Sequence, residues 1–587
     1  MKKGILTLAI GMMLTGCPEI YPLLEDPAAP IEAVIKVNEP QWYMDRKAIQ
    51  YDNTSLTEFY APLPVFFEGW MSSPRASIAS YTWDFGDGSP KFSGFNAAHV
   101  YESPGTYTAT LTVKSSTGET STAKKTIIVL ARAGRVFYVD AELGDDANNG
   151  LSQGAGAWKT ATHAFKGMTD ARYLPGDQIL FKRGQTFDLE VNATFIPHWQ
   201  AKYGYMFGAY GTGSKPVIQA VGEAAETTNM IGMYGVGSAF ISFVDLRFEC
   251  LPPGGVPANM VYAPGGGLNI LFLRCDVNNP ENAWLINSRS TGEEVFSGFF
   301  VVGCTSHNAN LIHLYTFASR VALLNSTFDL ANNHVAYLEQ VAVGVIDACT
   351  FSRPAFGRTA MRISKGGQAW VSNSKFLGWI DPQSDDNAHN GGGTRYNWLL
   401  VNFGPNNPEP KHTDYIVFEK NLVTNAETLM NVSTCHHFLA RNNTFVTPDN
   451  LGPTKIHFGD CRAWDYRPLK DVQFVDNTIE MTGGSRPHAV FAVYPYTRQA
   501  EYPTQAYHEE VVVKRNVVKI GSQDTRYWQV PADPAQYAGL ESDENTIHYN
   551  WPDSLRIQKQ TDPPTLMTMS EWTSETGNDA HTQIIVE

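Results

Sequence analysis

VDLRF (244–248) is the first of a series of related segments, followed by LRCDV (273–277), LLNSTF (323–328), IDACTF (346–351), VSNSKF (371–376), ARNNTF (440–445), FVDNTI (474–479) and VKRNVV (513–518). Each has a mostly small or amide side chain two positions before a final apolar residue. Successive final residues mostly lie 22 to 29 positions apart. A repeat of this length supplies three short strands per turn of a solenoid, whose turns stack about 4.8 Å apart.

The position two residues before that final apolar residue forms a column: Leu246, Cys275, Cys304, Ser326, Cys349, Ser374, Asn421, Asn443, Asn477 and Asn516. We predict an internal ladder in which the asparagine amides of the later coils hydrogen-bond from coil to coil. The cysteines of the column then act as small buried residues, and only Cys275 and Cys304 are placed to form a disulfide. The repeat is missing between Phe376 and Val423, which predicts an inserted loop at 378–416.

The composition agrees with a solenoid and limits the partners. The chain has 587 residues, of which 43% are hydrophobic and 18% charged, so a large core is available. The net charge of −15 argues against a nucleic-acid partner, which normally requires a basic surface. An acidic protein can still hold a local basic cleft for an anionic substrate.

Motifs at both ends of the repeat region support a named architecture. GDDANNG (144–150), WKT (158–160) and PGDQILFKRG (175–184) resemble the N-terminal cap and first coil of right-handed parallel β-helix proteins, many of which act on polysaccharides. The acidic run either forms a solvated turn or holds Ca²⁺, and no other cofactor is implied. MSEWTSETGNDAH (569–581) resembles the terminal segment of such proteins. We therefore expect a single-stranded right-handed parallel β-helix over 135–587, capped by 565–587, with Trp572 across its open end.

A separate domain precedes the β-helix. YTWDFGDGS (81–89) and HVYESPGTY (99–107) resemble the PKD domain, an immunoglobulin-like β-sandwich, so we expect an all-β protein with this sandwich at 31–131. The resemblance implies a spacer or a carbohydrate- or protein-binding module. Trp83 is expected in the core, and Asp84 and Asp87 in turn hydrogen bonds.

The first residues form a secretory signal. Lys2 and Lys3 precede an apolar run that is too short to span a bilayer, and LTGC (14–17) resembles the bacterial lipobox. The resemblance implies removal of 1–16 and lipidation of Cys17, followed by a proline-rich tether at 18–30. Pro18 rather than Asp follows Cys17, which favours the outer membrane. We expect a monomer in the cell envelope, on its periplasmic or its external side.

A further strand recurs about ten residues before each ladder segment. Alternation along these strands predicts one outward stripe of Tyr262, His313, Tyr337, Arg362, Asn431 and His457. A second predicted stripe contains Tyr234, Tyr315, Glu339, Ser364 and Ser433, with Lys365 just beyond it. Tyrosines offer flat surfaces for sugar rings, and an arginine can bind a uronate carboxylate. The alternative is a polar sheet face that loop 378–416 covers.

Two chemistries suit this stripe. In β-elimination, Arg362 would neutralise a uronate carboxylate, and Tyr337, His313, His457 or Lys365 would act as base or acid. In glycoside hydrolysis, Glu339 would need a second carboxylate from Asp460, Asp381, Asp385 or Asp386. The lyase requires fewer unseen groups. We thus predict a surface-anchored polysaccharide lyase of pectate-lyase-like fold, with Tyr262, Tyr315, Asn431 and Tyr234 binding substrate. A hydrolase, a non-catalytic glycan-binding adhesin and a structural spacer are the alternatives.

Known family signatures do not decide between these alternatives. The paired aspartates and Gly-His-Gly of polygalacturonases are absent, and Asn390-Gly391-Gly392-Gly393 lacks the glutamate of an alginate-lyase-like motif. His389 and Cys435-His436-His437 lack a recognised metal-ligand spacing, so we expect them to be structural and leave the metal open.

Overall fold

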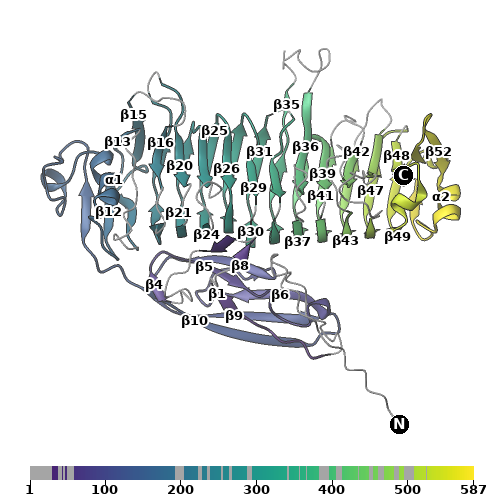
Figure 1. Ribbon diagram of the computed structural model, residues 1–587, viewed down its shortest axis with the longest axis horizontal. Helices are drawn as coiled ribbons and strands as arrows, with labels where there is room; N and C mark the ends of the chain where they lie inside the picture. The colour runs from purple at the N-terminus through teal and green to yellow at the C-terminus, as the bar shows by residue number, and fades with distance from the viewer. Residues whose placement is uncertain are drawn as a thin grey trace, which may run out of the picture.

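A computed structural model gives the fold of the chain, and it describes residues 29–37, 42–43, 46–48, 58–191, 204–222, 228–233, 238–252, 255–263, 267–286, 294–381 (except 340, 342, 356 and 365), 395–404, 413–447 (except 434), 454–459, 468–481, 488–494 and 508–586 (except 524). The predicted signal sequence, Cys17 and most of the predicted tether lie outside these residues. The described part contains a small β-sandwich and a long parallel β-helix (Figure 1). Among the described helices, none is long and apolar enough to cross a membrane.

Two antiparallel sheets form the sandwich. One contains β1 (Lys36–Val37), β5 (Leu63–Glu68) and β8 (Asn96–Tyr101). The other contains β4 (Glu58–Tyr60), β10 (Thr120–Leu130), β9 (Gly105–Ser115), β6 (Ile78–Asp84) and β7 (Phe92–Ser93), in which β4 pairs in parallel with β10. As predicted, Trp83 is buried between the sheets, and its indole N–H donates to Gly94 O at 2.8 Å. Asp84 and Asp87 accept turn hydrogen bonds from the backbone of Gly86 and Ser89.

Three sheets of mainly parallel strands form the β-helix, and a regular coil contributes one strand to each sheet. Sheet 1 contains β11 (Val136–Val139), β12 (Gln178–Lys182), β14 (Met206–Tyr210), β17 (Ser238–Ala239), β18 (Ser242–Val244), β21 (Gly267–Leu273), β24 (Glu294–Val302), β27 (Ala318–Leu324), β30 (Val343–Asp347), β33 (Gly367–Ser372), β37 (Thr413–Glu419), β40 (Cys435–Arg441), β43 (Lys470–Val475), β46 (Glu509–Lys514) and β49 (Leu540–Asp543). The hairpin β2 (Trp42–Tyr43) and β3 (Arg46–Ala48) joins it beside β24.

Sheet 2 contains β13 (Thr186–Glu190), β15 (Val217–Val221), β19 (Arg247–Glu249), β22 (Asp276–Asn278), β25 (Thr305–Ala309), β28 (Thr327–Ala331), β31 (Thr350–Pro354), β34 (Lys375–Leu377), β38 (Leu422–Thr424), β41 (Thr444–Thr447), β44 (Thr478–Met481), β47 (Val517–Ile520), β50 (Thr546–Tyr549) and β53 (Gln583–Ile585). Sheet 3 contains β16 (Asn229–Gly232), β20 (Asn259–Ala263), β23 (Asn282–Ile286), β26 (Ile312–Thr316), β29 (Ala336–Glu339), β32 (Met361–Ser364), β36 (Arg395–Phe403), β39 (Ala426–Val432), β42 (Thr454–Phe458), β45 (His488–Val493), β48 (Thr525–Pro531), β51 (Arg556–Gln560), β52 (Thr565–Thr568) and, paired with β36, β35 (Ile380–Asp381).

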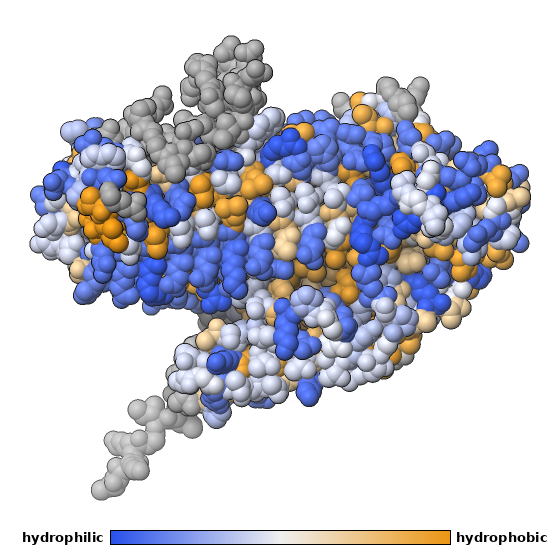
Figure 2. Space-filling model, turned by 180° about the vertical axis from the view of Figure 1, so that it is seen from behind, coloured by the Kyte–Doolittle hydropathy of each residue, from blue (hydrophilic) through white to orange (hydrophobic). Residues whose placement is uncertain are grey.

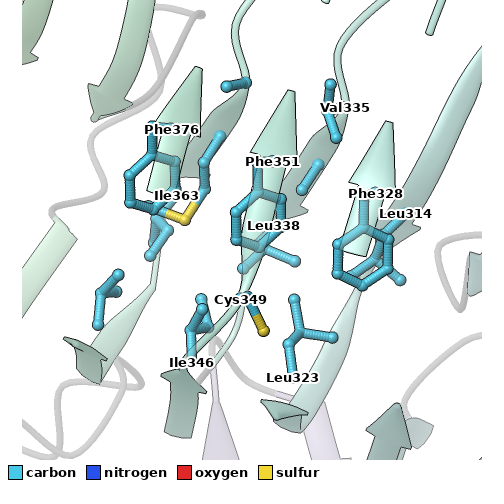
Figure 3. Packing of buried hydrophobic residues seen from close by; sticks show 14 of the residues in the cluster. Leu314, Leu323, Phe328, Val335, Leu338, Ile346, Cys349, Phe351, Ile363 and Phe376 are labelled. Atoms are coloured by element: carbon cyan, nitrogen blue, oxygen red, sulfur yellow. The ribbon is translucent and has the colours of Figure 1, made fainter. Parts of the chain in front are cut away.

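The core consists of columns of like side chains, because parallel strands in register place equivalent residues above one another. Phe328, Phe351 and Phe376 stack with centroid separations of 5.1 and 5.2 Å (Figure 3). Helix α1 (Ala161–Thr169) covers the first coils, and α2 (Met569–Thr576) covers the last, where Trp572 is fully buried. The fold is the predicted right-handed parallel β-helix behind a PKD-type sandwich.

The predicted asparagine ladder is confirmed. From Ser374 to Asn516, the backbone N–H of each ladder residue donates to the amide oxygen of the next coil at 2.9 Å. Asn545 extends the ladder by one coil. Cys275 and Cys304 are buried free cysteines, and the N–H of Cys275 donates to the Cys304 sulfur at 3.3 Å. Thiol, hydroxyl and amide thus fill the same role, which is to accept a backbone N–H at the corner between sheets 1 and 2.

The sandwich packs directly on the outer face of sheet 1. Phe66 packs on Phe300 with ring centroids 4.5 Å apart. Farther along, Trp70 packs on Tyr415 at 4.4 Å, while Phe95 packs on Trp370 at 5.3 Å. A buried ion pair joins the domains, since Arg320 Nε donates to Glu68 Oε1 at 2.7 Å. The PKD domain is therefore docked on the β-helix, and it is not a free spacer. Figure 2, seen from behind, shows the sandwich against the β-helix, whose surface carries hydrophilic areas and several hydrophobic patches.

Candidate functional site

Strand register defines one column of outward-facing positions on sheet 3, here called the outer column. Its members in successive coils are Tyr262, Leu285, Tyr315, Tyr337, Arg362, Asn402, Asn431 and His457. Five of them were predicted for the first stripe. Tyr315 was predicted for the second stripe, and the register instead places it beside Tyr337. Leu285 and Asn402 were missed, because each lies 19 positions before the ladder residue that follows it (Cys304 and Asn421) and not about ten.

An aromatic and cationic stack forms the centre of the outer column. The rings of Tyr315 and Tyr337 lie 5.2 Å apart, and the Arg362 guanidinium carbon lies 5.2 Å from the centroid of the Tyr337 ring. The Tyr315 hydroxyl donates to Glu339 Oε2 at 3.5 Å. Such an arrangement places a positive charge, a phenol and a carboxylate on adjacent coils. These groups are the ones that proton transfer next to an anionic sugar requires.

Exposure divides the outer column into two halves. Tyr262, Tyr315 and Tyr337 are half-buried, so their rings are available on the surface. Four polar members are almost fully covered: Arg362 (1% exposed), Asn402 (1%), Asn431 (2%) and His457 (3%). Within this half, Asn431 Nδ2 donates to Asn402 Oδ1 at 2.9 Å. The sequence did not distinguish these halves, since burial depends on segments far away in the chain.

The predicted outward orientation of His313 is wrong. His313 is 0% exposed, and its Nδ1 lies 2.7 Å from the Ser306 hydroxyl. Its Nε2 lies 3.0 Å from the backbone oxygen of Asp329, so this nitrogen carries the proton. The chain turns a corner into sheet 3 at this position, where Val335 and Ala360 of the next coils also face the core. The corner shifts the alternation by one residue, and His313 is a hydrogen-bonded core residue.

The stability of the protein should depend on keeping His313 neutral. Burial lowers the pKa of His313 to about 4, from its ordinary value of 6.5. The unfolded chain therefore binds a proton first, and stability is present above pH 6.5 and is lost as pH falls toward 4. We expect His313→Gln to remove about 2.5 kcal/mol of this dependence between pH 7.5 and 4.5. Urea unfolding of both proteins at the two pH values measures it. An equal change in the free energy of unfolding between the two pH values for both proteins would contradict the expectation.

Other predicted site residues lie in different surroundings. Glu339 and Ser364 are buried neighbours in register on β29 and β32. Tyr234, Lys365, His389, Cys461 and the side chains of Asp381, Asp385, Asp386 and Asp460 lie outside the described residues. The interval 378–416 is not only a loop, because it contains β35, β36 and the first residues of β37. It therefore supplies a strand to sheet 3 and the outer-column residue Asn402.

No group of three or more His, Cys, Asp or Glu in the described part of the chain could hold a metal ion. At the N-terminal cap, the Asp146 carboxylate accepts hydrogen bonds from the backbone of Lys159 and Thr160, which fixes the start of α1. Cys435 is buried, whereas His437 Nδ1 bonds to Asp471 Oδ2 at 2.8 Å. Both segments thus have structural roles, and Ca²⁺ at the cap remains a prediction.

Comparisons with known proteins give one family match, within the sandwich, and several similar solved structures. The family model for the PKD domain matches residues 56–129, which confirms the predicted sandwich. A solved structure described as carbohydrate-binding modules from the β-sandwich superfamily is 24% identical over 18% of this chain and only 37% of its own, with a TM-score of 0.15. The GH136 lacto-N-biosidase from Eubacterium ramulus is 13% identical over 71% and 68%, with a TM-score of 0.38. The family 28 exopolygalacturonase from Yersinia enterocolitica is 11% identical over 93% and 98%, with a TM-score of 0.34.

Proposed function

We propose that the protein is a polysaccharide-active enzyme of the cell envelope that cleaves a uronate-containing glycan by β-elimination. The observation that carries the proposal is the stack of Tyr315, Tyr337 and Arg362 on consecutive coils. Coils about 4.8 Å apart repeat on a scale close to that of sugar units in an extended chain. A row of tyrosines on such coils therefore offers successive platforms for sugar rings.

The proposed chemistry assigns one role to each group. Arg362 neutralises the uronate carboxylate, which acidifies the neighbouring C5–H bond. Tyr337, as the phenolate, removes that proton. The electron pair forms the C4=C5 double bond as the C4–O bond breaks, and the leaving oxygen takes a proton from a second acid, for which His457 and Lys365 are candidates. Glycoside hydrolysis would instead need a carboxylate partner for Glu339.

Non-catalytic glycan binding is the second candidate function, and the burial of Arg362 favours it. With 1% of its surface exposed, Arg362 can hold the Tyr337 ring by a cation–π contact without touching a sugar. The half-buried tyrosines would then bind glycan, and no bond would be cleaved. The Asn402, Asn431 and His457 half would serve to support the sheet.

The lipobox-like LTGC (14–17) supports a lipid anchor at Cys17, with the outer membrane as the proposed location. The full-length protein, extracted from membranes with detergent, tests the proposal as a whole. We expect it to partition into the detergent phase. We also expect a rise in ultraviolet absorbance, from the unsaturated product, on at least one of alginate, pectate and glycosaminoglycans. Binding without this rise would favour the second candidate function. The absence of both binding and turnover would exclude both candidate functions.

A further inference from the structure

Two buried polar atoms on the face of sheet 3 that carries Arg362 have no hydrogen-bond partner among the described residues. They are the hydroxyl oxygen of Ser364 and the amide oxygen of Asn431. Their side chains are 1% and 2% exposed. Burying a polar atom in this way costs free energy, and native proteins leave few such atoms unpaired. Their presence in the outer face of sheet 3 needs an explanation.

Strand register places both atoms around Arg362. Ser364 follows Arg362 by two positions on β32, so the two side chains leave the same face of the strand. Asn431 lies in the outer column two coils farther on, with Asn402 between it and Arg362. The Ser364 hydroxyl thus lies along the strand from the Arg362 guanidinium, and the Asn431 amide oxygen lies across the strands from it. All three residues fall within three consecutive coils.

On this face of sheet 3, Gly404 lies between Ser364 and Ser433 of the neighbouring coils. Gly404 follows Ser364 in the next coil, and its carbonyl accepts a hydrogen bond from Arg362 Nη2 at 3.3 Å. A Cβ atom at Gly404 would lie 2.3 Å from the backbone oxygen of Ser433. Only glycine permits this close approach. Ser433 is itself paired, since its hydroxyl donates to Phe403 O at 3.3 Å.

The chemistry of the unpaired atoms limits what can pair with them. Asn431 uses an N–H of its amide on Asn402, and its unpaired atom is the amide oxygen, which is an acceptor. A carboxylate or phosphate cannot satisfy an acceptor, whereas a sugar hydroxyl can donate to it. Ser364 can donate or accept. We propose that Ser364 and Asn431 form a hydroxyl-binding subsite for the sugar units that continue beyond the one held at Tyr337. The subsite rests on the proposed function, because it needs a glycan on this face.

Substitution of the unpaired groups should separate stability from binding. Ser364→Ala removes a hydroxyl that makes no described hydrogen bond, so we expect unchanged or higher thermal stability. We expect the same variant to bind uronate oligosaccharides from pectate or alginate about 2- to 10-fold more weakly, as for one lost hydrogen bond. Asn431→Leu, which has nearly the same shape, should also weaken binding.

Ser374→Ala is the matched control. Ser374 lies in the internal ladder, where its hydroxyl donates to Ser372 O at 2.7 Å and accepts from the N–H of Cys349 at 3.1 Å. It should lose stability and keep its affinity. Isothermal titration calorimetry and thermal unfolding of the four proteins give both readouts. Undiminished binding by Ser364→Ala and Asn431→Leu would overturn the subsite, with water as the partner of these atoms, but would leave the proposed function standing. Absence of binding by the unsubstituted protein would overturn both.

Discussion

Arg320→Ala is expected to destabilise the protein by about 3–5 kcal/mol, the usual effect of removing one partner from a buried ion pair. Arg320 on β27 is 1% exposed, and Glu68 on β5 is 4% exposed. Without the guanidinium, the Glu68 carboxylate stays buried between the PKD domain and sheet 1 and loses its ion pair with Arg320. The sandwich should then separate from the β-helix before the helix itself unfolds. Guanidinium denaturation, followed together with limited proteolysis at the junction, measures both effects.

Arg515→Ala provides the comparison for this variant. Arg515 also bonds a carboxylate, that of Asp476 at 2.9 Å, but the two side chains are 50% and 42% exposed. Water and salt screen such a pair, so the loss should stay below about 1 kcal/mol. Glu68→Leu combined with Arg320→Met should recover most of the stability, because no charge is then left buried. Equal losses for Arg320→Ala and Arg515→Ala would show that the domains do not depend on this contact.

The sequence contains a signal for the docked domain in the apolar runs of sheet 1. A strand with one wet face alternates apolar and polar residues, but sheet 1 contains continuous apolar runs such as 270–273 and 299–302. Ile270 and Phe272 fill the helix core, while Leu271 and Leu273 face the sandwich. Such a run requires both faces of the sheet to be covered. The apolar run does not show which segment covers the outer face of sheet 1, because complementarity between distant segments leaves no local pattern in the sequence.

The ladder was predictable and the candidate site was only partly so, for one physical reason. Ladder residues such as Asn443 and Asn477 repeat in a fixed place relative to an apolar residue, so register follows from spacing. Sheet 3 begins at a corner whose position varies from coil to coil. At this corner two successive residues face inward, so His313 lies in the core. Asn402 was lost because β36 lies in an interval without the repeat. Periodicity predicts correctly which side chains face the core where the coils are regular. It fails where a corner or an insertion interrupts the two-residue alternation.

If the protein is a lyase, Tyr337→Phe should lower kcat by about 10²–10⁴-fold with little change in KM. Phenylalanine keeps the ring that packs on Tyr315 and under Arg362, so sugar stacking and the local fold persist. Only the proton acceptor is removed. Arg362→Lys should lower kcat by about 10²–10³-fold, because a point charge cannot replace the planar fork on a carboxylate. Initial rates of unsaturated-product formation over a range of substrate concentrations separate the two constants.

The same pair of variants distinguishes catalysis from simple binding. A binding protein needs the flat Tyr337 surface and not its hydroxyl, so Tyr337→Phe would keep full affinity while Tyr337→Ala would lose it. Tyr107→Phe is the control for loss of a tyrosine hydroxyl, since Tyr107 bonds Ser103 O in the PKD domain, away from sheet 3. If kcat of Tyr337→Phe stays within a few-fold of that of the unsubstituted protein, Tyr337 is not the base, and another residue has that role. Arg362→Lys would then show whether the charge acts on the substrate or only holds the ring, because the first role alters kcat and the second alters affinity.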